Sequence, residues 1–236
     1  MKIADPTQET LVNEVRLMLD VLPFDDACVL ELGCGKAEKT RLLAATGRPR
    51  SIVALEVDDI QHQRNLQIGD LPKVHFRHGG AEAIPAADAS VDIVLMFKSL
   101  HHVPLAGMDA ALGEIARVLK PGGLAWISEP VFAGELNEVF RLFHDEKAVR
   151  EAAFAAIRKA VAVGRLSLEK QIFFNTRSYF ESFEQFDQRM IQVTHTKHQL
   201  APELYQRVRE KFASYLSPEG ATFLNPQRVD LLRKAA

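Results

Sequence analysis

The sequence has little cysteine and no long apolar run, and each absence excludes a class of protein. Its 236 residues include only two cysteines, Cys28 and Cys34. These lie at opposite ends of one predicted strand and turn, where they are poorly placed to form a disulfide. No C-x-x-C spacing offers a metal site, and no metal is expected. No apolar run approaches the roughly 20 residues of a membrane-spanning helix, so no membrane partner is expected.

The chain also lacks an excess of charge of either sign. Lysine and arginine total 29, aspartate and glutamate total 31, and the formal net charge is −2. This balance makes nucleic acid an unlikely partner, since phosphate neutralisation needs clustered cations. The first ten residues, MKIADPTQET, lack the charged start and apolar core of a signal peptide, so a cytoplasmic location is expected.

Apolar runs alternate with helical patterns through the first 130 residues. The runs at 27–32, 51–57, 74–77, 91–97 and 124–128 are predicted strands, and helices are expected between them and before the first, from Asp5 onward. Strands that alternate with helices indicate a parallel sheet with right-handed crossovers. The predicted fold class is therefore α/β.

The pattern changes after Pro130. A continuous helix is predicted over 134–162, a phenylalanine-rich helix over 178–188 and a further helix over 204–215, with strands over 190–198 and 222–232. No linker rich in glycine or serine separates the two halves. We therefore expect residues 131–236 to form a helical cap plus strands that complete the sheet, in the same domain as the core of residues 1–130.

The turn after the first predicted strand carries the central motif. Gly33 and Gly35 permit a tight turn and close approach of a ligand to the backbone. A dinucleotide site would place a third glycine where this chain has Glu38, and a carboxylate there would repel a pyrophosphate. Glu31, directly before the turn, suits a positively charged ligand. A cationic ligand without phosphates is predicted, and S-adenosylmethionine (SAM) fits that description.

Glu56 ends the second predicted strand, about 20 residues beyond the glycine turn. An acidic side chain at this spacing can accept hydrogen bonds from both ribose hydroxyls of an adenosine. Asp58 and Asp59 follow it but better fit a helix cap.

Four stretches together resemble the class I SAM-dependent methyltransferases, and most closely the group that includes ubiquinone and menaquinone C-methyltransferases. In order they are VLELGCGKAEKT, ALEVDD, AEAIPAADASVDIVLMFKSLHHV and EIARVLKPGGLAWISEP. The likeness covers about residues 25–130. It implies a Rossmann-like, doubly wound and mostly parallel sheet of seven strands with an antiparallel hairpin at its edge. SAM would lie across the strand ends.

The resemblance also implies roles for individual residues. Gly33 and Gly35, with Cys34 between them, would face the methionine part of SAM. Glu31 would lie near its amino group or order the turn. Glu56, followed by Val57, would hold the ribose.

One position departs from the family pattern. Members often carry G-D-A-E, with the aspartate on the adenine amino group, but this chain has Gly80 at the aspartate position. The adenine contact must then come from backbone amides near Ala81, from Glu82, or from neither.

Candidates for acceptor chemistry follow the fourth and fifth predicted strands. Lys98 is a predicted cofactor-binding residue in a region that should border both SAM and the acceptor, where its side chain either recognises an acidic group or extends into solvent. His101 or His102 is a candidate general base, or a histidine that fixes the loop. Glu129 either orients or deprotonates the acceptor, or caps the next helix.

The predicted function is transfer of a methyl group from SAM to a small organic acceptor. Two alternatives remain open: a methyltransferase that acts on RNA or protein, and a SAM-binding module without turnover. The basic residues Arg150, Arg158, Lys159 and Arg165 would serve the first alternative. The oligomeric state is also open, a homodimer included.

Overall fold

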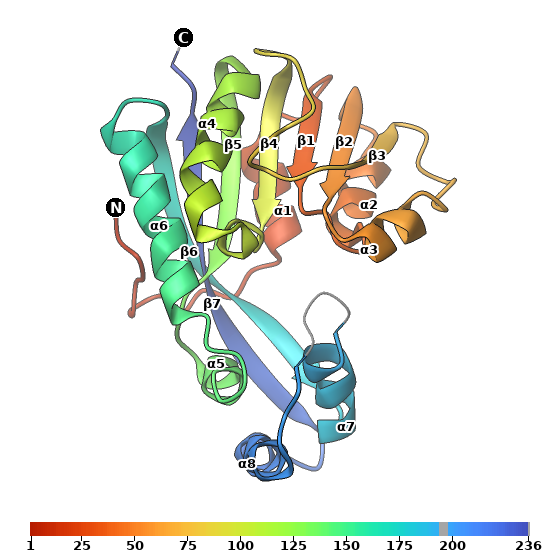
Figure 1. Cartoon of the computed structure of the whole chain (residues 1–236), viewed down its shortest axis with the longest axis vertical. Coiled ribbons are helices and arrows are strands. Elements are labelled where there is room, and N and C mark those ends of the chain that lie inside the picture. The colour runs from red at the N-terminus through yellow and green to blue at the C-terminus, as the bar shows by residue number, and fades with distance from the viewer. Residues whose placement is uncertain (194–197, 236) are drawn as a thin grey trace.

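The computed structural model describes residues 1–193 and 198–235, and its centre is one seven-stranded sheet (Figure 1). The strand order is β3-β2-β1-β4-β5-β7-β6. β1 to β5 run parallel, and β7 runs antiparallel to both β5 and β6. The strands are β1 (Cys28–Leu32), β2 (Ser51–Glu56), β3 (Val74–His78), β4 (Val91–Phe97), β5 (Leu119–Pro130), β6 (Ser167–Phe180) and β7 (Ala221–Arg233).

Helices cover both faces of the sheet. They are α1 (Glu14–Val21), α2 (Glu38–Ala45), α3 (Asp59–Asn65), α4 (Met108–Val118), α5 (Glu135–Phe140), α6 (Lys147–Ala162), α7 (Phe183–Phe186) and α8 (Pro202–Ala213). Short turns of other helix types occupy Leu100–His102, Leu105–Gly107 and Asp187–Ile191. This arrangement confirms the predicted α/β, Rossmann-like fold class, including the antiparallel hairpin at the sheet edge.

Two apolar clusters hold these layers together. On one face, Ile115 of α4 and Ile157 of α6 pack over Val94 of β4. On the other face, Met18 of α1 packs against Trp126 of β5 in a cluster that also includes α2. Burial on both faces explains why the central strands are continuous apolar runs rather than alternating ones.

The last two strands continue beyond the sheet as a two-stranded arm. β5 pairs with β7 only over Gln227–Arg233, whereas β6 pairs with the whole of β7. In Figure 1 the arm lies below the carboxyl ends of the parallel strands and carries α7 and α8. Its own apolar cluster consists of Val139, Phe180, Phe183, Phe186, Ile191, Val208, Phe212, Ala221 and Phe223. The expected helical cap is thus built on strands.

The prediction of one continuous helix over 134–162 is wrong. α5 ends at Phe140 and α6 begins at Lys147. The Asp145 carboxylate accepts a hydrogen bond from the Lys147 N–H at 2.9 Å, which satisfies a free donor at the start of α6. The six intervening residues turn His144 and Glu146 toward each other.

The predicted helix over 178–188 is also wrong at its start. Residues 178–180 complete β6, and Ser182 then caps the short helix α7 by accepting from the Gln185 N–H. Helical spacing of phenylalanines was the misleading signal, because pairing along all of β7 outweighs local preference. Of the strand predicted over 190–198, Met190 and Ile191 lie in a π-helical turn, and residues 194–197 lie outside the described residues.

The N-terminal helix begins later than predicted. Asn13 caps α1 by accepting from the Arg16 N–H, so the helix starts at Glu14 rather than near Asp5. Leu11, which was expected in the helix, instead forms an isolated bridge to Asn175 of β6. The first residues are therefore tied to the edge of the sheet.

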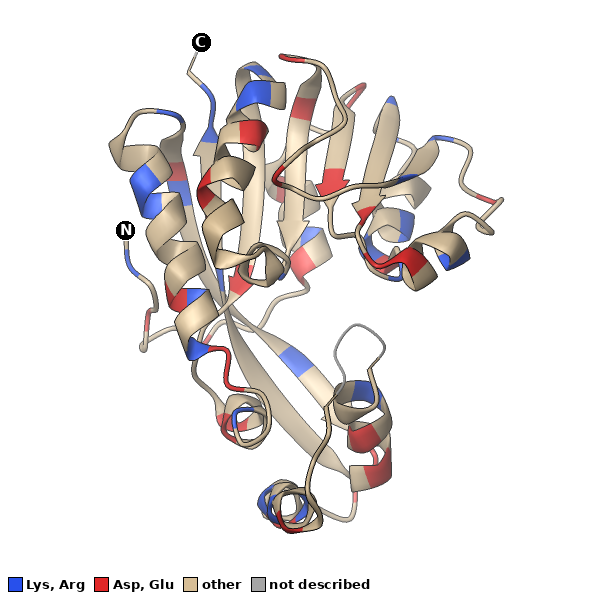
Figure 2. Ribbon diagram, viewed as in Figure 1, with Lys and Arg blue, Asp and Glu red and all other residues tan. Residues whose placement is uncertain are grey.

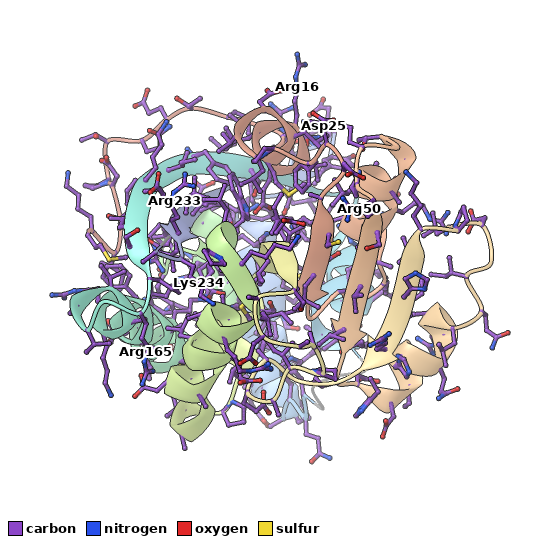
Figure 3. All side chains as sticks on the ribbon, turned by 90° about the horizontal axis from the view of Figure 1, so that it is seen from above. Arg16, Asp25, Arg50, Arg165, Arg233 and Lys234 are labelled. Carbon is purple, nitrogen blue, oxygen red and sulfur yellow. The ribbon has the colours of Figure 1, made fainter. Side chains whose placement is uncertain are left out.

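Charged residues gather at the amino end of the strands, as the view from above shows for Arg50, Arg233 and Lys234 (Figure 3). Arg50 pairs with Asp26 at 2.5 Å and Arg233 with Glu169 at 2.8 Å. Lys234 donates to the Leu119 carbonyl. These cations are neutralised or used structurally, which leaves the opposite, carboxyl edge as the place for chemistry.

Phe212→Ala should show how much the arm depends on its own cluster. Phe212 is fully buried among four aromatic rings, so its loss should lower the free energy of unfolding by about 3–5 kcal/mol. Denaturant unfolding measures this, with the exposed Leu216→Ala as control. A change below about 1 kcal/mol would contradict the packing described.

Candidate active site

The glycine turn after β1 requires glycine at two positions for different reasons. Gly33 and Gly35 have φ values of +73° and +52°. A Cβ atom at Gly33 would lie 2.8 Å from Cβ of Ser99, so β1 and the end of β4 meet there too closely for any side chain. A Cβ at Gly35 would meet nothing within 4 Å. Gly35 therefore borders open space.

That space is a hollow of about 290 Å³ at the carboxyl end of β1. Its lining includes four of the predicted cofactor residues, namely Glu31, Gly33, Cys34 and Gly35, together with Lys36, Glu38, Lys39 and Phe97. Two of these lining residues are carboxylic acids, Glu31 and Glu38, and two are lysines, Lys36 and Lys39, of which Lys39 is paired with Glu14. The hollow thus offers carboxylates to a cationic group of a ligand.

Glu56 joins the second strand to the glycine turn. One carboxylate oxygen accepts from the Gly35 N–H at 2.7 Å, and the other accepts from the N–H groups of Val57 and Asp58, both at 2.9 Å. Val57 itself is 59% exposed beside it. Asp58 caps α3 by accepting from the Gln61 N–H, which confirms its predicted role as a helix cap.

Glu31 is buried beneath the turn. Its carboxylate accepts a hydrogen bond of 2.6 Å from the Thr40 hydroxyl of α2. Burial raises the pKa of Glu31 to about 7, although the Thr40 hydrogen bond opposes the shift. A positive charge in the hollow would favour the ionised form. Burial, Glu31 and Glu56 also raise the pKa of the Cys34 thiol, which keeps it protonated.

The segment after β3 shows what replaces the missing aspartate. A Cβ at Gly80 would lie 2.6 Å from the Oε2 atom of Glu82, so the Glu82 carboxylate occupies the space of an aspartate side chain. The Gly79 N–H donates to the Glu56 carbonyl, which places this segment beside the end of β2. Ala81 is buried and Glu82 is exposed.

Lys98 follows β4 in a left-handed conformation with φ +56°. Within residues 1–193 and 198–235, its ammonium has no hydrogen bond or ion pair, unlike Lys39, which pairs with Glu14 at 2.9 Å. Burial, with a contribution from Lys39, lowers the pKa of Lys98. An unpaired, partly buried cation costs stability, and such costs concentrate at functional sites.

His101, which follows β4, and Glu129, near the end of β5, form a buried pair. The His101 Nδ1 atom lies 2.5 Å from the Glu129 carboxylate, whose other oxygen accepts from the Leu100 N–H. The two side chains are 3% and 2% exposed. The structure therefore brings two of the three predicted catalytic residues into contact, and the exposed His102 lies next to them with its ring centroid 4.1 Å from that of His101.

Sequence reasoning missed Glu146, which faces this pair from the start of α6. Its Oε1 atom lies 3.7 Å from His101 Nε2 and 3.1 Å from His144 Nε2. Arg150 holds the other oxygen at 2.6 Å. Burial opposes ionisation, but the charges of His101 and Arg150 prevail and lower the pKa of Glu146. The i, i+4 spacing of Glu146 and Arg150 was the signal available in the sequence.

The basic residues considered for an RNA or protein substrate are engaged elsewhere. Lys159 pairs with Asp109, Arg165 donates to the Asp109 carbonyl, and Arg158 lies over the ring of Phe154. In the view of Figure 2, basic and acidic segments are interspersed along the helices.

The chain matches a family model described as "Methyltransferase domain" over residues 30–127. A protein of Mycolicibacterium smegmatis named "Probable S-adenosylmethionine-dependent methyltransferase" is 36% identical over 104 residues, which are 43% of this chain and 37% of that protein. A fatty-acid O-methyltransferase of the same organism is 37% identical over 97 residues, 40% of this chain and 34% of that protein. The alignments thus span little more than a third of these relatives.

A solved structure supports the fold over nearly the whole chain. The YcgJ protein of Bacillus subtilis superposes with a TM-score of 0.69 at 17% identity, and the match covers 94% of this chain and 98% of that one. Among the residues that the structure describes, no helix is long and apolar enough to cross a membrane.

Lys98→Met should make the protein more stable, because it removes an unpaired cation from a partly buried position. A gain of about 1 kcal/mol would raise the melting temperature by about 2–4 °C in a chain of this size. Thermal unfolding at pH 7 measures it. Lys39→Met is the matched control and should lower the melting temperature, because it strips the buried Glu14 of its partner. Equal effects of the two changes would contradict this assignment.

Proposed function

We propose that the protein transfers a methyl group from SAM to a small organic acceptor, and that residues 30–127, which match the methyltransferase family model, form its SAM-dependent methyltransferase domain. The observation that carries the proposal is the hollow beside Gly35, which is open, bordered by carboxylates and placed at the carboxyl end of β1. In a doubly wound sheet this is where ligands bind.

We propose that residues 1–130 hold SAM and that residues 131–236 cover the acceptor. Gly33, Cys34 and Gly35 would border the methionine part, with Glu31 near its ammonium group. Glu56 and Val57 would hold the ribose, since the Glu56 carboxylate already orders both strand ends.

Recognition of adenine is assigned to the segment after β3. Glu82 would take the place of the missing aspartate, because its carboxylate fills the space beside Gly80. Backbone amides near Ala81 would complete the contact.

Bound SAM supplies an electrophilic methyl group on a sulfonium centre, so the protein's task is alignment and exclusion of water. We propose that Lys98 binds an acidic group of the acceptor, because it directly follows Phe97, which lines the hollow, and its ammonium lacks a partner among the described residues. One relative is named for a fatty acid, which agrees with an acidic acceptor.

His101, His102 and Glu129 belong to the acceptor side of this proposal. Glu129 acts as a positioning residue, since its carboxylate lies on the Nδ1 side of His101 and directs Nε2 toward Glu146. The likeness to ubiquinone and menaquinone C-methyltransferases also belongs to the proposal. Because one relative is an O-methyltransferase, the proposal includes oxygen as the acceptor atom.

Gly35→Val should abolish SAM binding, because its side chain would enter the hollow without touching the rest of the protein. Calorimetric titration with SAM measures binding. Gly47→Val is the matched control: Gly47 also has a positive φ and open space but does not border the hollow. Both variants should be equally strained, and only Gly47→Val should bind. Normal binding by Gly35→Val would move the site elsewhere.

SAM affinity should rise with pH around neutrality. Glu31 has a pKa of about 7 in the free protein, and a bound ammonium group favours its ionised form. Below pH 7 the Glu31 carboxyl group is mostly protonated and must lose its proton when SAM binds, which weakens SAM binding there. Between pH 6 and 8 the affinity should rise by about tenfold. Titrations at both pH values measure this, and Glu31→Gln should remove most of the dependence. The same slope in Glu31→Gln would exclude Glu31 as its source.

A further inference from the structure

Two histidines and a glutamate from separate parts of the chain converge beside the hollow. His101 and His102 follow β4, whereas Glu146 lies at the start of α6. One nitrogen of each histidine and one Glu146 oxygen all lie within 4.8 Å of one another. Ser99, two residues before His101, donates a hydrogen bond of 2.8 Å to the carbonyl of Leu32, which directly precedes Gly33 of the glycine turn. The cluster therefore borders the same edge of the sheet as the hollow.

The distances suit a shared ion. Two ligand atoms that each lie about 2.1 Å from a tetrahedral metal are about 3.4 Å apart. Oε1 of Glu146 lies 3.7 Å from Nε2 of His101. The same oxygen lies 3.1 Å from Nε2 of His144, whose ring contacts that of His198 at 4.8 Å between centroids. Small side-chain adjustments would thus bring the ligand atoms to coordination distance.

The two buried side chains of the cluster, His101 and Glu146, are each oriented by a neighbouring charged residue. Glu129 lies on the Nδ1 side of His101, which directs Nε2 toward Glu146. Arg150 binds the Oε2 atom of Glu146 through two nitrogens, at 2.6 and 3.1 Å, which directs Oε1 toward the histidines. Metal-binding histidines and carboxylates are typically oriented in this way, by a carboxylate on the second ring nitrogen and a hydrogen bond on the second oxygen.

We propose that His101, His102 and Glu146 bind one divalent transition-metal ion beside the methyl-transfer site. Two imidazoles and one carboxylate favour ions such as Zn²⁺, Fe²⁺ or Co²⁺ over Mg²⁺ or Ca²⁺, which prefer all-oxygen sites. Three protein ligands leave coordination positions open for water or for an oxygen of the acceptor.

The competing explanation is an ion-pair network without a metal. A histidine between two carboxylates can be stabilised as a cation, and Arg150 already balances Glu146. Such a network binds no ion, whether or not His102 belongs to it. A contribution of His102 to ion binding therefore separates the two explanations.

The test uses the full chain, stripped of metal with a chelator and then titrated with Co²⁺ by visible absorption and with Zn²⁺ by calorimetry. We expect one ion per chain. His102→Ala should weaken binding at least about tenfold, since it removes a ligand. His75→Ala, an equally exposed histidine on β3, should leave binding unchanged.

Glu129→Gln supplies a second measurement, because Glu129 would not touch the ion yet positions His101. It should weaken metal binding about 10–100-fold while the melting temperature confirms folding. Absent binding, several weak equivalents, or equal behaviour of His102→Ala and His75→Ala would overturn the metal site in favour of the network.

The placement of the metal site beside the methyl acceptor rests on the proposed function. The metal site and the methyltransferase function therefore need separate measurements. SAM titration of the metal-stripped protein tests the methyltransferase proposal alone. SAM binding without metal binding would refute only the metal site, and metal binding without SAM binding would refute only the proposed function.

Discussion

Three buried carboxylates near the carboxyl ends of the parallel strands β2, β1 and β5 constrain the backbone at this edge of the sheet. Glu31, Glu56 and Glu129 are each less than 8% exposed, and burying a carboxylate is costly unless donors surround it. Each has found local donors: the Thr40 hydroxyl, the backbone N–H groups of the glycine turn, and the N–H of Leu100 with the His101 ring. These hydrogen bonds fix the backbone of the glycine turn and of the segment after β4, which border the proposed ligand site.

Residues 131–236 make two separate contributions to the fold: they complete the sheet, and they bring Glu146 to His101. β7 completes the sheet along β5, and the arm that continues from it has its own aromatic core. The break between α5 and α6 brings Glu146 against His101, so this buried cluster is assembled from segments about 45 residues apart. Loss of packing in the arm and loss of charge pairing at the site are therefore separable events, because they depend on different clusters.

Much of the fold was predictable because its signals are local. A strand buried on both faces must be apolar along its length, so β1, β2 and β4 are evident in the sequence. The glycine turn and Glu56 follow from backbone geometry and spacing. The errors arose where tertiary pairing outweighs local preference. Ser178–Phe180 belong to a stretch with helical spacing of phenylalanines, but they extend β6. The helix predicted over 134–162 is interrupted by the segment that ends in Glu146.

The sequence by itself determined the parallel core, the glycine turn and the carboxylates beside it, because each depends on residues close together in the chain. Only the tertiary structure decided that Glu82 fills the space beside Gly80, that Lys98 lacks a partner among the described residues, and that Glu146 meets His101. These three facts concern which side chains come into contact and which charges are paired. Both depend on how the folded chain packs, because the contacting atoms are brought together only by the tertiary structure.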